Sequence, residues 1–351
     1  MTDLSTIESV LEENKVERHL DFTVNVPCPM KPRFVSEYEV FAPEYARVVG
    51  RDLYAFVPSV CGGHAKVENT LRDIAAMREP WQVPDFQIGL GFGDLLLSEY
   101  HKRFVRGGLF QQVIDPFDCP LTSSSEFVDP LGAYNPIALM PDLLLVDTKK
   151  LGDRPVPQRL EDLLDPVYEG CIALQGEHNN DKSDNRMWPA TRILLEFYKR
   201  FGEDGLMALK PNIKTVFHGQ GGARACGTND PEAAAIYLMP SIFALSTANK
   251  GHVQLVWPKD KAPVQVMVLM ARKDYAPENK ALLDWLLSER VGRVFAENNL
   301  LSTCSGVENP IPEDAEISWL GWEWIYNQDI AATLAKFDEL VGWFVRSGEE
   351  C

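Results

Sequence analysis

Two cysteines and a histidine in the amino-terminal part of the chain carry side chains that can bind a metal ion. Cys28 follows a predicted strand at residues 21–26. Cys61 and His64 follow a second strand, predicted at 53–57. Because parallel strands end at the same edge of a sheet, these side chains are expected to lie close together. Two thiolates and one imidazole suit zinc or another soft cation, but the spacing matches no known metal motif. Buried structural thiols are the alternative, and no other cofactor is expected.

Further polar groups follow the second and third predicted strands. The loop at 58–64 contains Ser59 and adjacent glycines, which let the backbone approach a ligand and offer amides to an anion. After the third strand, at 85–90, a glycine-rich turn ends in Asp94, which can pair with a cationic ligand group. The glycines at 89, 91 and 93 lack the third-glycine spacing of a dinucleotide-binding fingerprint, and Asp94 stands where the pyrophosphate would lie, so no nucleotide site is expected. Plain strand-to-helix turns are the alternative for both loops.

The second half of the chain offers another set of candidate ligand groups. They follow predicted strands or begin predicted helices, and they are Glu177, His178, Gly222, Arg224 and Tyr237. A helix start presents unpaired amides to an anion, and Arg224 can form paired hydrogen bonds with a carboxylate or phosphate. A surface arginine in a flexible loop is the alternative. Tyr237 is expected to end a strand at 233–239 and to project toward the other candidates.

Length, charge and hydropathy restrict the class of protein. The chain has 351 residues, which is too long for one ordinary core, and 45% of them are apolar. The net charge of −17 argues against nucleic acid as a partner. No apolar run approaches the length that crosses a membrane, so membrane insertion is not expected. We expect a monomer that binds a small molecule or an ion.

The first 20 residues are acidic and lack the apolar core of a signal peptide. They predict a short amphipathic helix, which we expect to be an extension retained in the working protein. The seven cysteines are odd in number and scattered, which is typical of reduced thiols. The expected location is therefore the cytoplasm, or the periplasm or extracellular space if a signal precedes this sequence.

Predicted strands and helices alternate along the chain, which indicates an α/β fold with parallel sheets. A helical pattern at 31–49 follows the first strand, and the longest helix is expected at 186–201. In between, strands at 143–146 and 171–174 flank a short helix at 159–164. These strands show no polar alternation, which is typical of a sheet that is covered on both faces.

The segment around these strands resembles type II periplasmic binding proteins of ABC importers, in the branch for ferric iron, polyamines and thiamine. In that branch an Asn/Asp-Thr-Lys motif is followed by Asp-Leu-Leu-Asp-Pro-x-Tyr-x-Gly, and residues 147–149 and 162–170 match this pattern. The Pro-x-Asp-x-Ala-Pro-Val motif at 258–264 and the helical pattern at 286–298 resemble the segment that returns to the first lobe. The resemblance covers roughly residues 20–345 and indicates the family rather than the ligand.

The resemblance implies a two-lobe fold with a central cleft and a C-terminal helical cap. Lobe 1 is expected to contain residues 21–135 and 252–351, and lobe 2 residues 136–251, with crossings near 133–141 and 247–253. The implied function is a solute-binding protein that captures a small ligand, an anion or a metal ion, between hinged lobes. The implied partner is an ABC transporter permease.

Ferric-iron binders of this kind present adjacent tyrosines near Tyr237, but Leu238 follows it here, which argues against ferric iron. Thiaminase-like relatives use a cysteine in the cleft as a nucleophile. The alternative function is therefore a cytosolic enzyme in which Cys61 is the nucleophile and His64 the base. No third group that would orient the base is evident, so we expect a binding protein and not an enzyme.

Overall fold

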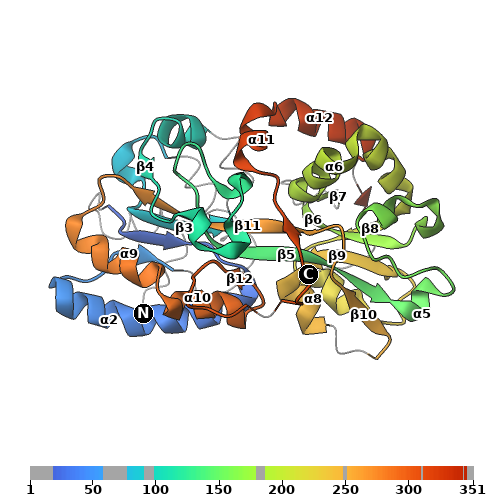
Figure 1. The fold of residues 1–351 in the computed structure, drawn as a ribbon, viewed down its shortest axis with the longest axis horizontal. Helices are drawn as coiled ribbons and strands as arrows, with labels where there is room; N and C mark the ends of the chain where they lie inside the picture. The colour runs from blue at the N-terminus through green and yellow to red at the C-terminus, as the bar shows by residue number, and fades with distance from the viewer. Residues whose placement is uncertain are drawn as a thin grey trace. The chain divides into compact units, whose positions relative to one another are not determined.

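The computed structural model describes residues 19–57, 77–90, 99–178, 186–247, 251–309, 311–342 and 344–345. The chain forms two compact units, in which residues far apart in the sequence come together (Figure 1). Unit 1 contains residues 1–139, 266–310 and 321–323, and unit 2 contains 140–265, 311–320 and 324–351. Most of the expected N-terminal extension, residues 1–18, lies outside the described residues.

Unit 1 contains a mixed group of parallel and antiparallel strands. Its strands are β1 (Phe22–Val24), β2 (Ala55–Phe56), β3 (Phe86–Leu90), β4 (Phe110–Gln111), β12 (Leu301–Ser302) and parts of β5 (Asn135–Asp147) and β11 (Ala262–Arg272). β1 pairs in parallel with both β2 and β3, and β11 runs antiparallel to β3. The strands β1, β2 and β3 lie within the ranges predicted from the sequence.

Helices cover the strands of unit 1. They are η1 (Cys28–Met30), α2 (Lys31–Val49), η2 (Pro80–Gln82), η3 (His101–Val105), η4 (Pro116–Asp118), η5 (Pro120–Thr122), η6 (Ser125–Phe127), η10 (Pro277–Asn279), α9 (Lys280–Leu286), α10 (Glu289–Glu297) and the start of α11 (Trp322–Asn327). α2 ends at Gly50, whose φ of +81° suits the left-handed end of a helix. The ring of Phe41 stacks on Trp285 of α9 at 4.4 Å between centroids, which fixes α2 against α9.

Unit 2 contains a second mixed sheet. Its further strands are β6 (Ile172–His178), β7 (Arg186–Pro189), β8 (Ile213–Phe217), β9 (Ile236–Pro240), β10 (Val253–Val256), β13 (Ile317–Ser318) and β14 (Phe344–Val345). β6 is parallel to both β8 and β9, whereas β5 is antiparallel to β9 and β10. Every residue of β5 is buried, as the unbroken apolar pattern at 143–146 indicates.

The helices of unit 2 include its longest element, α6 (Thr191–Leu209), which has a kink at Gly202. The others are α5 (Thr148–Leu151), η7 (Glu161–Leu164), η8 (Pro166–Tyr168), η9 (Lys210–Asn212), α7 (Gly221–Ala225), α8 (Ser241–Thr247) and α12 (Ile330–Leu340). The long helix starts later than expected, because residues 186–189 form β7 and Pro189 ends that strand.

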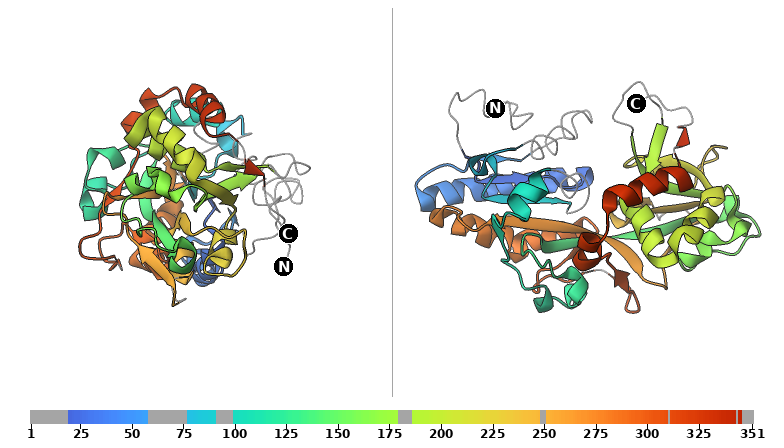
Figure 2. Two further views of the ribbon diagram at one scale, coloured as in Figure 1. Left: turned by 90° about the vertical axis from the view of Figure 1, so that its right-hand side faces the viewer. Right: turned by 90° about the horizontal axis from the view of Figure 1, so that it is seen from above.

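Most of the tail packs on unit 2 rather than on the first lobe as expected, whereas residues 321–323 belong to unit 1, where Trp322 stacks on Tyr134. α12 lies along α6, and the buried ring of Phe337 meets Tyr198 edge-on at 5.5 Å (Figure 2). The return to the first unit also comes later than the expected position near residue 252, at 265/266. The reason is that β10 still pairs with β5 inside unit 2. The apolar stripe in the sequence of the tail indicated that this face of the helix would be buried, but it did not indicate which surface of the protein buries it.

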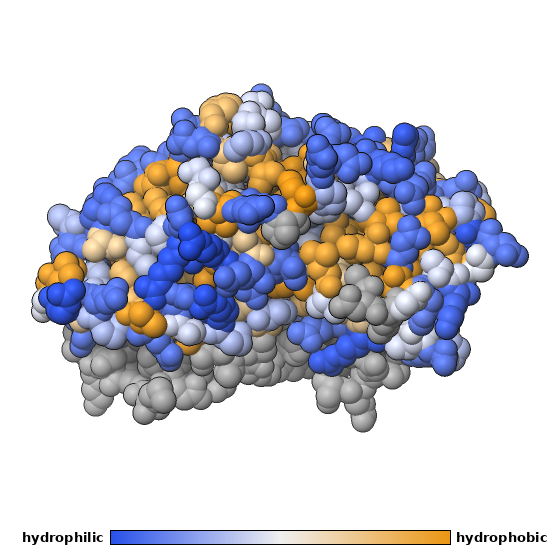
Figure 3. Space-filling model, turned by 60° about the horizontal axis from the view of Figure 1, so that its bottom comes forward, coloured by the Kyte–Doolittle hydropathy of each residue, from blue (hydrophilic) through white to orange (hydrophobic). Residues whose placement is uncertain are grey.

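The outer surface carries polar residues over most of the face that Figure 3 shows, with apolar areas between them. Large apolar side chains with substantial exposure come from separate elements, and they are Val40, Val48, Trp81, Phe117, Val167 and Met207. Within the described part of the chain, no helix combines the length and the apolar character that a membrane crossing requires.

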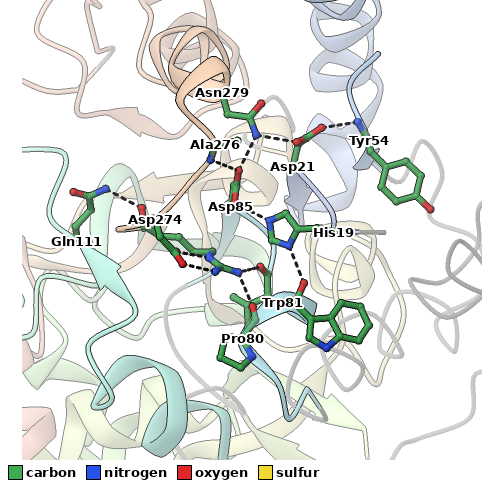
Figure 4. A network of polar contacts seen from close by, with 12 residues as sticks. His19, Asp21, Tyr54, Pro80, Trp81, Asp85, Gln111, Asp274, Ala276 and Asn279 are labelled. Carbon is green, nitrogen blue, oxygen red and sulfur yellow. Dashed lines mark hydrogen bonds and ion pairs between the residues drawn. The ribbon is translucent and has the colours of Figure 1, made fainter. Parts of the chain in front are cut away.

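Buried carboxylates at the amino ends of β1 and β3 form a polar network in unit 1 (Figure 4). The side-chain amide of Asn279 donates to Asp21 at 2.8 Å and to Asp85 at 2.7 Å. Arg51 forms a two-pronged pair with Asp21, with N–O distances of 2.7 and 2.9 Å. The hydrogen bonds to Arg51 and Asn279 outweigh the effect of burial and lower the pKa of Asp21. This network fixes the start of both strands at the edge opposite to their carboxyl ends.

The surroundings of His19 and His101 in unit 1 shift the pKa values of the two rings in opposite directions. Burial lowers the pKa of His19, but its hydrogen bonds to Asp85 and to the Trp81 carbonyl outweigh this effect and raise the pKa. Both ring nitrogens face acceptors at 2.7 Å, which only the doubly protonated ring can satisfy. By contrast, burial and then the nearby Arg106 lower the pKa of His101 to about 4, against an opposing effect of Asp129.

These opposite shifts predict opposite pH dependences of stability. The stabilisation from His19 is complete below its unfolded pKa and is lost as the pH rises through the raised folded value. For His101, stability is lost as the pH falls from about 6.5 toward the lowered folded value. We expect His19→Gln to remove more stability at pH 5 than at pH 8. For His101→Gln we expect the opposite: relative to the wild-type protein, its free energy of unfolding should be lower at pH 8 than at pH 5.

Urea unfolding of both variants and the wild-type protein at these pH values measures the difference. Two variants with the same dependence on pH would show that these histidine contacts do not control the protonation of the rings.

Candidate ligand-binding site

The parallel strands of unit 2 end at one edge, which is where ligands bind in open α/β sheets. β6 pairs with β8 up to Gln175 and Phe217, and β9 ends at Pro240, where α8 begins. The chain continues from β8 through a turn into α7. This edge of unit 2 therefore gathers segments that are far apart in the sequence.

A buried ion pair lies next to this edge. Arg192, in the first turn of α6, forms a fork with the carboxylate of Asp142 on β5, and its Nη2 lies 3.0 Å from Oδ1. The same nitrogen donates to the side-chain oxygen of Gln175, at 2.6 Å. Asp142 is 0% exposed, so the fork replaces the water that its carboxylate loses on folding. Burial raises the pKa of Asp142, and the guanidinium of Arg192 opposes this shift.

A second pair lies one turn along α6. Glu196 and Arg200 are in contact at 2.7 Å, and the hydroxyl of Ser318 donates to Glu196 at 3.0 Å. Arg200 also donates to the carbonyl of Asp260, at 2.9 Å. These bonds tie the segment around Ser318 to α6. A small recess beside both pairs is walled by apolar side chains, which include Phe197, Leu238, Pro263, Val264 and Leu320.

The guanidinium groups of Arg192 and Arg200 face the carboxylates of Asp142 and Glu196, and Asp260 adds a third carboxylate, 3.8 Å from Arg200. Both guanidinium groups are already paired with carboxylates, so neither is available to bind an anionic ligand. The chemical role of this cluster is to hold β5, the end of β6 and the start of α6 in a fixed arrangement. It therefore supports the edge at which β6, β8 and β9 end, rather than binding a charged ligand itself.

Removing one member of the buried pair should be costly. We expect Arg192→Met to lower the free energy of unfolding by about 3–5 kcal/mol, because it leaves a buried carboxylate without its partner. The loss should be larger at pH 8 than at pH 5, since an unpaired Asp142 has a raised pKa and its ionised form destabilises the fold. Urea unfolding at both pH values measures the effect.

Two controls accompany this prediction. The double variant Asp142→Leu, Arg192→Met should be more stable than Arg192→Met, because it also removes the carboxylate that is left unpaired. Arg293→Ala removes an exposed pair with Glu289 and should cost about 0.5 kcal/mol or less. If the double variant is no more stable than the single one, the loss comes from packing and not from the unpaired carboxylate.

Of the predicted first-lobe candidates, the structure describes Cys28. Ser59, Cys61, His64 and Asp94 lie outside the described residues. Cys28 lies in η1, directly after β1, and is exposed with a free thiol. The proposed set of Cys28, Cys61 and His64 thus remains a prediction. Among the residues that the structure does describe, no cluster of His, Cys, Asp and Glu has the arrangement of a metal site.

The candidates of the second lobe occupy different positions. Glu177 and His178 are the last residues of β6, where its backbone pairs with β7. Gly222 is buried in α7, and a Cβ there would lie 2.6 Å from the ring of Phe217, so close packing explains this glycine. Arg224 is exposed near the end of the same short helix, and its Nη2 donates a long hydrogen bond of 3.4 Å to the side-chain oxygen of Gln220.

Tyr237 does not end a strand as expected but lies in the core of unit 2. β9 begins only at Ile236, so Tyr237 is its second residue, well before the carboxyl end. The side chain is 1% exposed, and its hydroxyl accepts a hydrogen bond from the amide of Ala234 at 3.0 Å. Burial raises the pKa of its phenol, which disfavours the phenolate that a metal would need.

The sequence interpretation did not identify Asp142, Gln175, Arg192 or Glu196. One signal was present, because Asp142 is a charged residue beside the apolar run at 143–146, where burial demands a partner. Nothing in the sequence pointed to Arg192 as that partner, since the pair joins separate elements, β5 and α6.

Comparisons with known proteins agree with this architecture. Residues 82–328 match the model of a family described as bacterial extracellular solute-binding protein. No curated protein sequence matches the chain. Ferric iron-binding protein A of Mannheimia haemolytica, in an open conformation, is 12% identical with a TM-score of 0.62, over 92% of this chain and 98% of that one.

Other solved structures share the fold at similarly low identity. Iron-bound HitA of Pseudomonas aeruginosa is 14% identical with a TM-score of 0.59, covering 92% of this chain and 99% of that one. AfuA of Actinobacillus pleuropneumoniae with fructose-6-phosphate is 17% identical with a TM-score of 0.57, covering 92% and 98%. The predicted α/β fold of type II periplasmic binding proteins is therefore confirmed. The chain belongs to the family of bacterial extracellular solute-binding proteins.

Proposed function

We propose that this solute-binding protein captures a small anionic solute outside the cytoplasm and delivers it to the permease of an ABC importer. The observation that carries the proposal is the edge of unit 2 where β6, β8 and β9 end, together with exposed Arg224 in α7, the short helix that follows β8. The family description, extracellular, supports this location and gives no support to the cytoplasmic expectation.

An anion is favoured over a cation by the charged group that unit 2 offers. Arg224 carries a planar guanidinium that pairs well with a carboxylate or a phosphate. Tyr237 was the candidate for an iron ligand, but its hydroxyl lies in the core and accepts a hydrogen bond from the amide of Ala234. The similar structures include proteins with iron, with iron and citrate, and with fructose-6-phosphate, so this fold holds ligands of both kinds.

The enzyme alternative receives no support from the family, which is described as solute-binding, or from the similar ferric iron-binding protein A. We therefore propose binding without catalysis. Cys28, Glu177 and His178 stay candidates for ligand contact, as do Ser59, Cys61, His64 and Asp94 outside the described residues.

Native mass spectrometry of freshly purified protein tests the proposal. We expect a mass excess that disappears on denaturation and corresponds to a small anion. Against that ligand, Arg224→Ala should lose about 2–5 kcal/mol of binding free energy in calorimetric titration. Arg159→Ala, which removes an exposed arginine elsewhere in unit 2, is the matched control and should bind as the wild-type protein does.

Equal affinities of the wild-type protein and Arg224→Ala would contradict the role of this arginine. A retained metal ion with no anion would contradict the proposed ligand class. Finding the protein only in the cytoplasmic fraction of its bacterial cell would contradict the proposed role in import.

A further inference from the structure

A buried lysine in unit 1 has no polar partner among the residues that the structure describes. Lys31, the first residue of α2, is 1% exposed. In the described part of the chain, its ammonium nitrogen makes no hydrogen bond and no ion pair. Charged side chains are rarely buried unless they are paired, because the lost hydration must be replaced. An unpaired ammonium group therefore destabilises the fold and requires another reason to be present.

The acidic groups packed around α2 do not neutralise this charge. Asp21 is paired with Arg51, with an N–O distance of 2.7 Å. Glu37 pairs with both Arg33 and Arg290. Each of these carboxylates has a guanidinium partner, and neither forms an ion pair with Lys31.

The position of Lys31 is that of a ligand contact. β1 ends at Val24, and the chain then runs through η1 directly into α2, so Lys31 lies just beyond the carboxyl end of a parallel strand. Side chains of a helix lean toward its amino end, and the amino end of α2 is the end that follows β1 in the chain.

The start of α2 adds to the positive potential. No side chain caps the helix, and its 19 residues align their peptide dipoles with the positive end at Lys31. Pro29 and Pro32 remove amide donors here, so the lysine supplies the main contact for an anion.

We propose that Lys31 is the anchor for a carboxylate or phosphate group of the solute. This inference rests on the proposed function and specifies the residue of unit 1 that recognises the anion. The bound anion supplies the missing counter-charge, so the cost of burying Lys31 in the empty protein is recovered on binding.

Calorimetric titration of the wild-type protein and Lys31→Met with inorganic phosphate, citrate and fructose 6-phosphate tests the proposal. We expect at least one of these anions to bind the wild-type protein, and Lys31→Met to bind it about thirtyfold more weakly or worse, which equals about 2 kcal/mol. The three probes separate a phosphate preference from a carboxylate preference.

Thermal unfolding of the empty proteins gives a second readout. Lys31→Met should melt at the same temperature or higher, because it removes an uncompensated buried charge. Lys273→Met, which removes an exposed lysine of unit 1, should change neither binding nor melting. If Lys31→Met does not fold, Lys31→Gln removes the charge while keeping a polar end, and the same loss of binding is expected.

The outcomes separate this inference from the proposed function. Unchanged anion binding in Lys31→Met overturns the role of Lys31 and leaves solute binding intact. A neutral or cationic ligand found by mass spectrometry, with no binding of the anions, overturns the inference as well. If neither method finds any ligand, both the inference and the proposed function fail.

Discussion

Burying a carboxylate requires partners that replace its lost water, and this requirement organises both units of the protein. In unit 1, Asn279 donates to Asp21 and Asp85, which fixes the amino ends of β1 and β3 against the segment before α9. In unit 2, Arg192 pairs with Asp142, which fixes the start of α6 against β5. Each cluster provides hydrogen-bond partners to polar groups from separate elements, so removing one member leaves the others without their partners. Such bonds favour one arrangement of strands over others that would bury the same apolar area.

Lys31 is the exception, because it is a buried charged side chain with no partner among the described residues. Where the structure has only to be stable, the buried charges are matched, as in Asp142 with Arg192 and Glu196 with Arg200. A charge that is buried without a match lowers stability, and proteins retain such groups where binding or chemistry requires them. The described part of α2 shows matched pairs along its outer face and an unmatched cation at its start. The difference marks the start of α2 as a place for a ligand.

The fold persists at identities of 12–17% to solved structures, because it depends on the order of strands and on burial rather than on particular ligand groups. Tyr237 illustrates this separation. Its ring packs against Phe217 at 5.8 Å between centroids, and its hydroxyl binds the amide of Ala234, so in this chain it contributes to the core of unit 2. A family fold therefore does not bring a family ligand with it, and the ligand has to be inferred from the charged groups of this chain.

The sequence by itself determined the α/β class, the family and the approximate place of β1, α2, β3 and β6, because these depend on local periodicity and on short motifs. It did not determine that residues 186–189 form β7, since this short strand lies between β6, which precedes it in the chain, and β14, which comes from the far end of the sequence. It also did not assign the tail to unit 2, because an apolar stripe shows that α12 is covered but not by which helix. The pair of Asp142 with Arg192 and the isolation of Lys31 were decided only by the tertiary structure, since both depend on which charges meet across separate elements.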